Sequence, residues 1–446
     1  MIYTFFAFQR YCLGSKSDVS KVIAGMDWQE LYSFASKQAF LGLCFDGIER
    51  LGEEYPEELK RNPIGRELLM TWMGKAQQIR RQNMKVNAVA SKLFSMLRED
   101  GLRCCILKGQ GNALMYPNPY SRTPGDIDIW VEGGDKRVIS FVRSISPHEK
   151  ACYHHIEFPS YKGIEVEVHY RPSFLLCFWH NRKLQKYYER VKEEQFSHRV
   201  MLGEQGEIAI PTAEFNLIFQ LTHIYAHLMN EGIGLRQLLD YYYVLCDFYK
   251  VYQNFSITHP SSLTLKGGST AFPKPLSPQG TGDVTAPSRR SEPLRSKVGG
   301  PSKVSPDCTG WDRLSIEGDN SAGSTTAVTS SASTALDVVQ KELKELGLWK
   351  FAGGIMYIMQ EVFGMPASRL IVPPNEKYGK FVLNEVLEAG NFGRHDARNR
   401  FGRSQLGHNL QRVYRDIRLV RYFPAEALCE PLFRTWHFFW RLKYKK

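Results

Sequence analysis

The sequence predicts an α+β protein in which a small mixed β-sheet with helices lies between helical regions. Three observations predict this fold. Apolar residues recur at helical spacing through most of the first hundred residues. Between residues 102 and 175 the pattern changes to short β-branched or alternating segments separated by Gly, Pro and Asn. Helical spacing returns near Pro211 and continues toward the C-terminus, with one long interruption.

Composition divides the 446 residues into five regions. From about Ser256 to Thr334 the chain is mostly Ser, Thr, Gly, Pro and scattered charge, which cannot bury enough apolar surface to offset its ordering entropy. We therefore expect a disordered low-complexity insertion there. The expected regions are N-terminal helices over 1–100, an α/β core over 101–205, helices over 206–255, the insertion over 256–334, and a basic helical region over 335–446.

Overall composition is typical of a folded globular protein, with 43% hydrophobic and 13% aromatic residues. No apolar run approaches the roughly 20 residues that span a bilayer, and the first residues lack the basic leader of a signal peptide. We therefore expect no membrane span and a cytoplasmic location. The nine cysteines show no paired CxxC spacing, so the pattern predicts neither a zinc site nor a disulfide framework.

Positive charge is concentrated at the C-terminus. The formal net charge is +12, and the segment from Arg394 to Lys446 holds 13 Lys and Arg against 4 Asp and Glu. Such an excess favours polyanions such as nucleotide phosphates or RNA, although a solvated helix face is an equally good interpretation. Arginines recur every three residues and could follow a phosphate backbone; they are Arg412, Arg415, Arg418 and Arg421. In the final FRTWHFFWRLKYKK, buried packing is the commoner explanation of the aromatic residues, ahead of base stacking or membrane contact.

The stretch SRTPGDIDIWV, residues 121–131, combines a strand pattern with two acids. Side chains alternate faces along a strand, so Asp126 and Asp128 point together away from their apolar neighbours. The segment GIEVEVHYR places Glu165, Glu167 and His169 on one face in the same way. If these strands are neighbours, three carboxylates converge, as in sites that hold two Mg²⁺ ions for phosphoryl or nucleotidyl transfer. Alternation alone cannot choose between the two glutamates.

Two basic residues near these acids are candidate phosphate ligands. The segment ILKG is a predicted strand that ends in a glycine turn, which leaves backbone N–H groups and the Lys108 ammonium free to meet phosphate oxygens. Arg122 lies four residues before Asp126 and offers a second, fork-shaped phosphate donor.

These motifs resemble a known family. An LKG followed by Tyr-Pro, then R-x-x-x-DID and a later acid-Val-His, is similar to the uncharacterised bacterial nucleotidyltransferases of the DNA polymerase beta-like superfamily. Three later segments are similar to helical hallmarks of that family, and the resemblance covers most of the chain outside the insertion. They are HIYAHLMNEGIGLRQLLD, EAGNFG and YFPAEALCEPLFRTWHFFWR.

The resemblance implies a polymerase beta-like core, an NTP substrate and Mg²⁺ or Mn²⁺ as cofactor. It implies that Asp126 and Asp128 are the paired metal ligands, and that Glu167 is the third acid, which binds the catalytic metal and helps to deprotonate the acceptor hydroxyl. Gly109 would be the turn glycine beside the triphosphate. Gln110, a further candidate nucleotide-binding residue, follows it where the superfamily usually has Gly or Ser, and the stretch from this turn to the aspartates is longer than usual.

The segment around GIG supplies further candidates. Arg236 and Gln237 would line the nucleotide cleft, because a flanking helical domain usually closes over the base in this superfamily; a structural salt bridge from Arg236 to Asp240 is the alternative. His223 and His227 are one helical turn apart and have the spacing of zinc ligands, but polar ties between helices are the favoured interpretation. His154 and His155 are expected to be structural.

The favoured function is transfer of a nucleoside monophosphate from an NTP to an acceptor hydroxyl, with release of pyrophosphate. The acceptor, whether a small molecule, a protein or RNA, stays open, and the basic C-terminal helix suits RNA. One alternative is a nucleotidyltransferase toxin that acts on tRNA. The others are a glycosyltransferase that holds a nucleotide sugar through DID and one metal, and an inactive binding or scaffold protein that keeps the fold.

Overall fold

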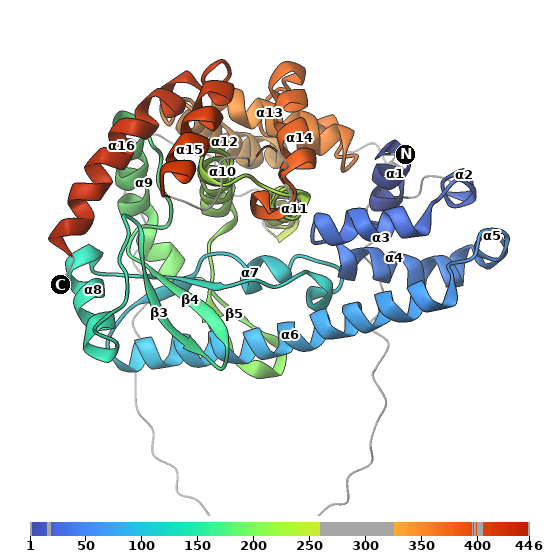
Figure 1. Ribbon diagram of the computed structural model, residues 1–446, viewed down its shortest axis with the longest axis horizontal. Helices are drawn as coiled ribbons and strands as arrows, with labels where there is room; N and C mark the ends of the chain where they lie inside the picture. Colours follow the sequence, from blue (N-terminus) through green and yellow to red (C-terminus); the bar gives the residue numbers. More distant parts are fainter. Residues whose placement is uncertain are drawn as a thin grey trace, which may run out of the picture.

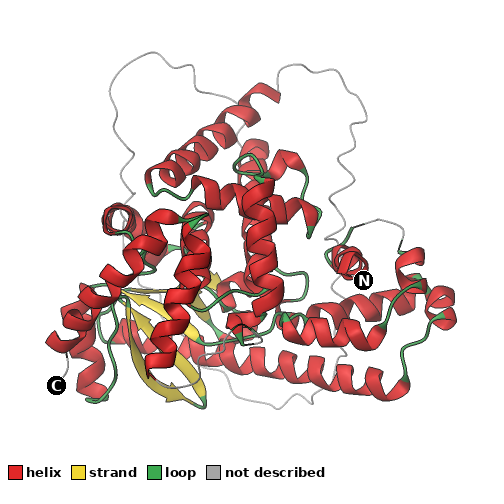
Figure 2. Cartoon of the chain, turned by 45° about the horizontal axis from the view of Figure 1, so that its top comes forward, coloured by secondary structure: helices red, strands yellow, loops and turns green. Residues whose placement is uncertain are grey.

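The computed structural model describes residues 2–15, 19–258, 325–394, 396, 398 and 405–444. Within these ranges, many helices surround a four-stranded sheet and a two-stranded one (Figures 1 and 2). The predicted α+β class, a small mixed sheet with helices before and after it, is confirmed.

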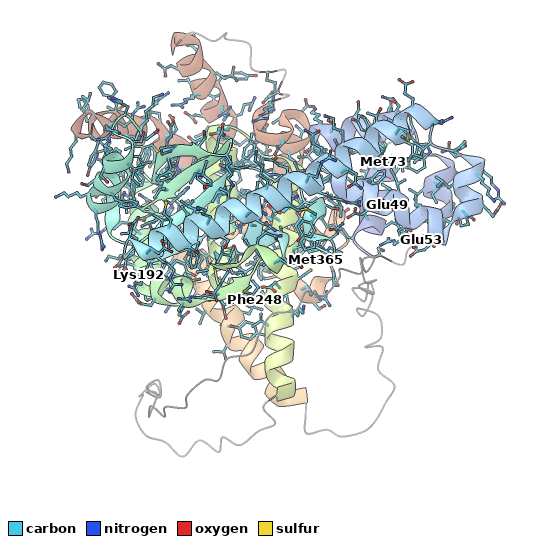
Figure 3. All side chains as sticks on the ribbon, turned by 90° about the horizontal axis from the view of Figure 1, so that it is seen from below. Glu49, Glu53, Met73, Lys192, Phe248 and Met365 are labelled. Atoms are coloured by element: carbon cyan, nitrogen blue, oxygen red, sulfur yellow. The ribbon has the colours of Figure 1, made fainter. Side chains whose placement is uncertain are left out.

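The N-terminal region is helical, and its last and longest helix supports the sheet. Helix α6 (Arg66–Glu99) buries Trp72 and Ala76 in its first half, and from Asn83 to Leu97 it buries a mostly apolar face. It runs beneath the strands in Figure 1, and Figure 3 shows it from below with the exposed Met73 in its N-terminal half. The preceding helices are α1 (Ile2–Cys12), α2 (Ser20–Ala24), α3 (Trp28–Lys37), α4 (Leu41–Glu54) and α5 (Pro56–Arg61).

The four-stranded sheet has the order β1-β2-β4-β3. Its strands are β1 (Cys104–Ile106), β2 (Ile127–Val131), β3 (His155–Tyr161) and β4 (Ile164–His169). β2 and β4 are parallel, whereas β1 and β3 pair antiparallel with their neighbours. The sequence predicts β1, β2 and β4 but not β3, which contains Pro159 and has an irregular register between Phe158 and Tyr161. Such a strand is tolerated because it lies at the edge of the sheet.

Short elements and two longer helices complete the core. They are α7 (Gln110–Ala113), η1 (Pro119–Ser121), α8 (Gly134–Ile145), α9 (Phe178–Ser197), β5 (Arg199–Met201), η2 (Gly203–Gln205) and β6 (Glu207–Ala209). The β2 residue Trp130 packs its ring against Phe196 of α9 and Phe215, with centroids 4.7 and 5.8 Å apart. This aromatic contact joins the sheet to the helices that follow it.

The remaining helices cover the side of the sheet opposite α6 (Figure 1). They are α10 (Ala213–Asn230), α11 (Leu235–Thr258), α12 (Thr325–Glu345), α13 (Trp349–Glu361), η4 (Ala367–Arg369), α14 (Glu376–Ala389), η5 (Asn391–Gly393), α15 (Gln405–Val420) and α16 (Pro424–Lys443). α10 is buried on nearly all sides, which fits its apolar composition and its contacts with α11, α12 and α15. α16 lies beside α9 at the edge of the molecule.

The low-complexity insertion predicted for residues 256–334 falls largely outside the described residues, which leave out 259–324. On either side of that gap, α11 continues to Thr258 and α12 begins at Thr325. None of the helices in the described ranges is long and apolar enough to cross a membrane.

Candidate active site

Three acids converge where β2 and β4 run side by side. Asp128 is paired in register with Glu167, and paired residues on neighbouring strands point to the same face of a sheet. Asp126 directly precedes β2 and is two residues from Asp128. One carboxylate oxygen from each of the three can be chosen so that all lie within 4.8 Å of one another. The structure therefore brings together the three acids that the sequence singles out.

Two cations already contact the most buried of these acids. Asp128 is only 2% exposed. Its Oδ2 lies 3.0 Å from Lys108 Nζ, and its Oδ1 lies 2.9 Å from His169 Nε2. Burial alone would raise the pKa of Asp128, but the Lys108 charge and the hydrogen bond from His169 outweigh it and lower that pKa. Mutual repulsion between the acids is therefore offset by the protein's own groups.

His169 links two of the acids. Its Nε2 also lies 3.3 Å from Glu167 Oε2. Burial opposes protonation of this imidazole, but its hydrogen bonds to Asp128 and Glu167 prevail and raise its pKa to about 9. Burial likewise opposes ionisation of Glu167, but the hydrogen bond from His169 and the nearby charges lower its pKa to about 2. At neutral pH the site thus holds a charged imidazolium and an ionised Glu167.

Lys108 follows β1 and faces the acids. Burial alone would lower its pKa, but the charges of Asp126, Asp128 and Glu167 raise it. Its Nζ also lies 3.1 Å from His223 Nε2, so α10 contributes directly to the site. His227, one turn further along α10, lies 3.0 Å from the same His223 nitrogen.

The acids open onto a cavity of about 610 Å³. Lys108, Asp126, Glu167 and His169 line it, whereas the neighbouring exposed Glu165 does not. Six histidines contribute to its wall; they are His154, His155, His169, His223, His227 and His437. Arginines from the C-terminal region line it too, namely Arg394, Arg412 and Arg434. Glu231 and Glu430 line this wall as well, and Arg434 pairs with Glu430 at 3.3 Å. The cavity therefore joins an acidic floor to a wall of mixed charge in which the arginines outnumber the carboxylates, an arrangement that can accept a metal-bound polyphosphate.

The glycine turn predicted to hold phosphate lies beside the acids. Gly109 has a φ of +64°, which favours glycine, and a Cβ there would come 3.7 Å from the Asp126 carbonyl oxygen. Gln110 is buried, and its amide donates to Asn87 of α6. It is not among the residues that line the cavity.

Arg122 has a buried partner. Its Nε and Nη2 donate to the two oxygens of Asp240, at 2.8 and 2.7 Å, and Tyr116 also donates to that carboxylate at 2.7 Å. Arg122 is 4% exposed and does not line the cavity. The structure thus places this predicted phosphate ligand in an ion pair that ties the core to α11.

Arg236 and Gln237 are also buried. Arg236 Nη1 donates to the Thr123 carbonyl at 3.0 Å, and Gln237 accepts from the Gly234 amide at 3.0 Å. Neither residue lines the cavity, and Asp240 forms its ion pair with Arg122. Both side chains fix the loop that leads into β2 and the turn that begins α11.

The arginines that recur every three residues in and just after α15 have different surroundings. Arg412 is exposed and lines the cavity, whereas Arg415 is buried. Arg418 pairs with Glu385 of α14 at 3.0 Å, and Arg421 is exposed. Only part of the stripe is therefore placed to meet a phosphate in the cavity.

Several histidines of the site lack an obvious sequence signal. His154 and His155, expected to be structural, have partners in the cavity: His155 Nδ1 lies 3.1 Å from His154 Nε2 and 3.2 Å from Glu167 Oε2. His169 could be found from alternation, because it shares a face with Glu167. The spacing from His227 singles out His223, but it does not reveal the contact with Lys108, which joins residues 115 positions apart.

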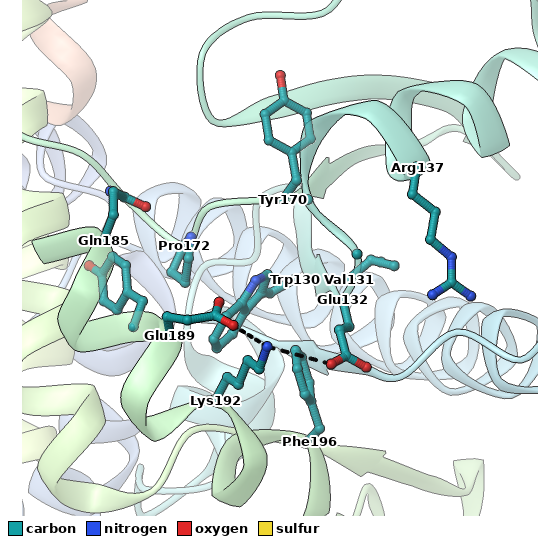
Figure 4. A pocket seen from close by; sticks show the side chains of 13 residues that line it. Trp130, Val131, Glu132, Arg137, Tyr170, Pro172, Gln185, Glu189, Lys192 and Phe196 are labelled. Carbon is teal, nitrogen blue, oxygen red and sulfur yellow. Dashed lines mark hydrogen bonds and ion pairs between the residues drawn. The ribbon is translucent and has the colours of Figure 1, made fainter. Parts of the chain in front are cut away.

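A second cavity, of about 330 Å³, lies toward the other end of β2 (Figure 4). It is lined by residues that include Trp130, Glu132 and Lys192. Lys192 pairs with Glu189 and lies 3.7 Å from Glu132, so its charge is already matched. Because the three converging acids line or adjoin the larger cavity, that cavity is the candidate active site.

Comparison with known proteins agrees with this choice. The family model described as "Uncharacterised nucleotidyltransferase" matches residues 24–251, which is more than half of the chain and includes the acids, Lys108 and the glycine turn. No curated protein and no solved structure matches the chain. The matched range ends before the EAGNFG and YFPAEALCEP segments. On the extent of this match, the chain belongs to the family of uncharacterised nucleotidyltransferases.

Proposed function

We propose that the protein is a metal-dependent nucleotidyltransferase that moves a nucleoside monophosphate from an NTP to an acceptor hydroxyl. In this reaction a bond forms between the acceptor oxygen and the α-phosphorus. The bond from that phosphorus to the bridging oxygen breaks, and pyrophosphate leaves. The observation that carries the proposal is the convergence of Asp126, Asp128 and Glu167, at two parallel strands, beside a cavity whose wall carries three arginines.

The donor set fits Mg²⁺ or Mn²⁺. All three residues offer carboxylate oxygens, which these hard cations prefer, and their ligand atoms lie within 4.8 Å of one another. We propose that Asp126, Asp128 and Glu167 hold the metal. When bound, it would neutralise developing charge on the phosphates and make the acceptor hydroxyl easier to deprotonate.

The chain's own cations would hold the phosphates. Lys108 lies at the boundary between the acids and the cavity, and Arg394, Arg412 and Arg434 line the wall contributed by the C-terminal region. Their charges oppose the repulsion between a triphosphate and three carboxylates. Gly109 would let the backbone approach the phosphates closely.

Glu167 is the acid that we propose meets the acceptor. Its side chain is 31% exposed, against 1% for Asp128, so a hydroxyl in the cavity can reach it. Its low pKa keeps it ionised at neutral pH. We propose that it accepts the hydrogen bond of the acceptor hydroxyl and helps to remove the proton during transfer.

A direct test uses the full chain with each α-labelled NTP, Mg²⁺ or Mn²⁺, and either total RNA, protein or a metabolite extract. Pyrophosphate release and label in each fraction are measured together. We expect both to depend on metal and to be lost in Asp126→Asn, which alters a half-buried acid. NTP binding without transfer to any fraction would contradict the proposal and favour the scaffold alternative. Transfer from a nucleotide sugar alone would favour a glycosyltransferase.

The same experiment addresses the tRNA alternative. The cavity wall could also accommodate a polyanionic acceptor, because Arg412 is exposed and belongs to the positively charged C-terminal region. Label in tRNA that falls steeply with added salt would support RNA as the acceptor. Label confined to protein or small molecules would exclude it.

A further inference from the structure

The start of α9 meets α16 through four potential metal ligands. Cys177 and His180 are three residues apart, and so are Glu426 and Cys429. Residues three apart on a helix share a face, so each element presents a pair of ligands toward the other. Cys177 and Glu426 are buried, whereas His180 and Cys429 are half-buried.

The distances within this cluster suit a tetrahedral ion. Ligand atoms of Cys177, His180 and Glu426 all lie within 4.8 Å of one another. His180 Nδ1 and Glu426 Oε1 are 3.3 Å apart. Two ligands at about 2.0–2.1 Å from a tetrahedral zinc are about 3.4 Å apart, so this pair needs almost no rearrangement. Cys429 stands outside that group of three, but its thiol lies beside the Cys177 thiol, which makes it the candidate fourth donor.

Surrounding groups orient the two non-sulfur ligands. Glu426 Oε2 accepts hydrogen bonds from the backbone amides of Leu176 and Cys177, at 2.5 and 3.1 Å, so that its Oε1 stays directed at His180. Gly347, which follows α12, lies against the His180 ring, and a Cβ there would come within 2.4 Å of Cε1. Such outer contacts are typical of metal sites.

Hydrogen bonding alone explains the positions of Glu426 and His180 but not the presence of the two thiols. Glu426 stabilises the first amides of α9, and His180 can donate to Glu426, but neither role requires two thiols beside them. Sulfur and imidazole donors favour zinc over Mg²⁺ or Ca²⁺. We propose that Cys177, His180, Glu426 and Cys429 bind one zinc-like divalent cation, which fastens the C-terminal helices to the core. This site shares no residue with the proposed catalytic acids and does not depend on the proposed function.

The proposal is tested by titrating the metal-free full chain with Co²⁺ under a non-thiol reductant. We expect one equivalent to bind with a thiolate-to-cobalt charge-transfer absorption, which Zn²⁺ abolishes by displacement. Cys429→Ser and His180→Gln should each weaken Co²⁺ binding by about 100-fold or more, beyond the usual cost of losing an outer contact. Cys246→Ser, in α11, is the control and should bind as the wild type does. Circular dichroism confirms that each variant is folded.

Cys152→Ser decides between two clusters, because Cys152, His154 and His155 also lie within 4.8 Å of one another in the catalytic cavity. Loss of the charge-transfer band in Cys152→Ser, with the band retained in Cys429→Ser, would overturn the proposal. So would a disulfide between Cys177 and Cys429 in the purified protein, if the reduced chain then bound no Co²⁺. Zinc should also raise the thermal midpoint of the wild type but not that of Cys429→Ser.

Discussion

Asp128 and Glu167 face each other across the parallel strands β2 and β4. His169 Nε2 lies between them, 2.9 Å from one carboxylate and 3.3 Å from the other. The pair is therefore held by a cation of the protein itself, and this arrangement determines what each substitution should do.

Asp128→Asn should abolish nucleotidyl transfer and also destabilise the fold. Asp128 is buried between Lys108 and His169, and removing its charge leaves the half-buried Lys108 without its closest partner. Breaking a buried pair costs about 3 kcal/mol at the lower end of the usual range. We expect urea denaturation to show this decrease in the free energy of unfolding. A variant more stable than the wild type would show that repulsion between the acids dominates instead.

Asp126→Asn should separate the loss of nucleotidyl transfer from the loss of stability. Asp126 is only half-buried, so its substitution should abolish transfer with a much smaller change in the free energy of unfolding. Pyrophosphate release and urea denaturation measured on the same preparation check this. Wild-type turnover in Asp126→Asn would contradict its role as a metal ligand.

Glu167→Gln should reduce kcat by roughly 100-fold or more while changing Mg-NTP affinity far less, because the proposed role of Glu167 is to take the proton from the acceptor hydroxyl. Glu165→Gln is the matched control, since Glu165 lies two residues away on β4, is exposed and does not line the cavity. It should cost less than about tenfold. Turnover and NTP affinity of both variants settle the assignment, which fails if Glu165→Gln is the more damaging change.

The acid site could be predicted because it depends on local periodicity. Alternation places Asp126 and Asp128 on one face and both Glu165 and Glu167 on one face, and the family resemblance then chooses Glu167. The parallel pairing of β2 and β4 brings the three acids together. The fold class follows from the same change of period. The edge strand β3 was missed because its proline and polar residues weaken the strand pattern, and its pairing partner supplies what its sequence lacks.

Partners of the basic and amide residues could not be predicted from spacing. Arg122 binds Asp240, 118 positions later, and Gln110 donates to Asn87 of α6. Both side chains look like free phosphate ligands in the sequence, because motif spacing does not reveal which distant group will share their burial. The same limit hides the contact of His223 with Lys108, which forms only through the packing of α10 against the sheet.

Arg412→Gln should weaken NTP binding without affecting stability. Arg412 is exposed and lines the cavity, so it can give a charge-assisted hydrogen bond to a phosphate. We expect the Kd for Mg-NTP to rise about tenfold, which corresponds to about 1.4 kcal/mol. Isothermal titration provides the measurement. Arg421→Gln, an exposed substitution outside the cavity, is the control and should bind NTP normally.

Arg122→Met should destabilise the fold without weakening NTP binding. It leaves the buried Asp240 without its ion-pair partner, which costs about 3–5 kcal/mol of unfolding free energy. NTP affinity of the folded protein should stay within about twofold of the wild type, the scale of coupling between separate sites. A tenfold loss of affinity at conditions where the variant is fully folded would restore Arg122 as a phosphate ligand.

The contact between α15 and α16 should weaken as pH rises. Burial and the neighbouring Glu430 raise the pKa of Asp416 to about 7, with Arg434 and Arg415 opposing the increase. Because the folded-state pKa of Asp416 is above its unfolded value of about 3.9, the contribution of this group to stability is full below that unfolded value and is lost as pH rises through about 7.

Asp416→Asn removes the titration, so the variant should lose less stability than the wild type between about pH 5.5 and about pH 8.5. Urea denaturation at both pH values measures how much unfolding free energy is lost. Glu430→Gln should also make this loss smaller than in the wild type, because Asp416 then ionises without repulsion from Glu430. Equal pH dependence in Asp416→Asn and the wild type would show that the two carboxyl groups do not share a proton in the folded protein.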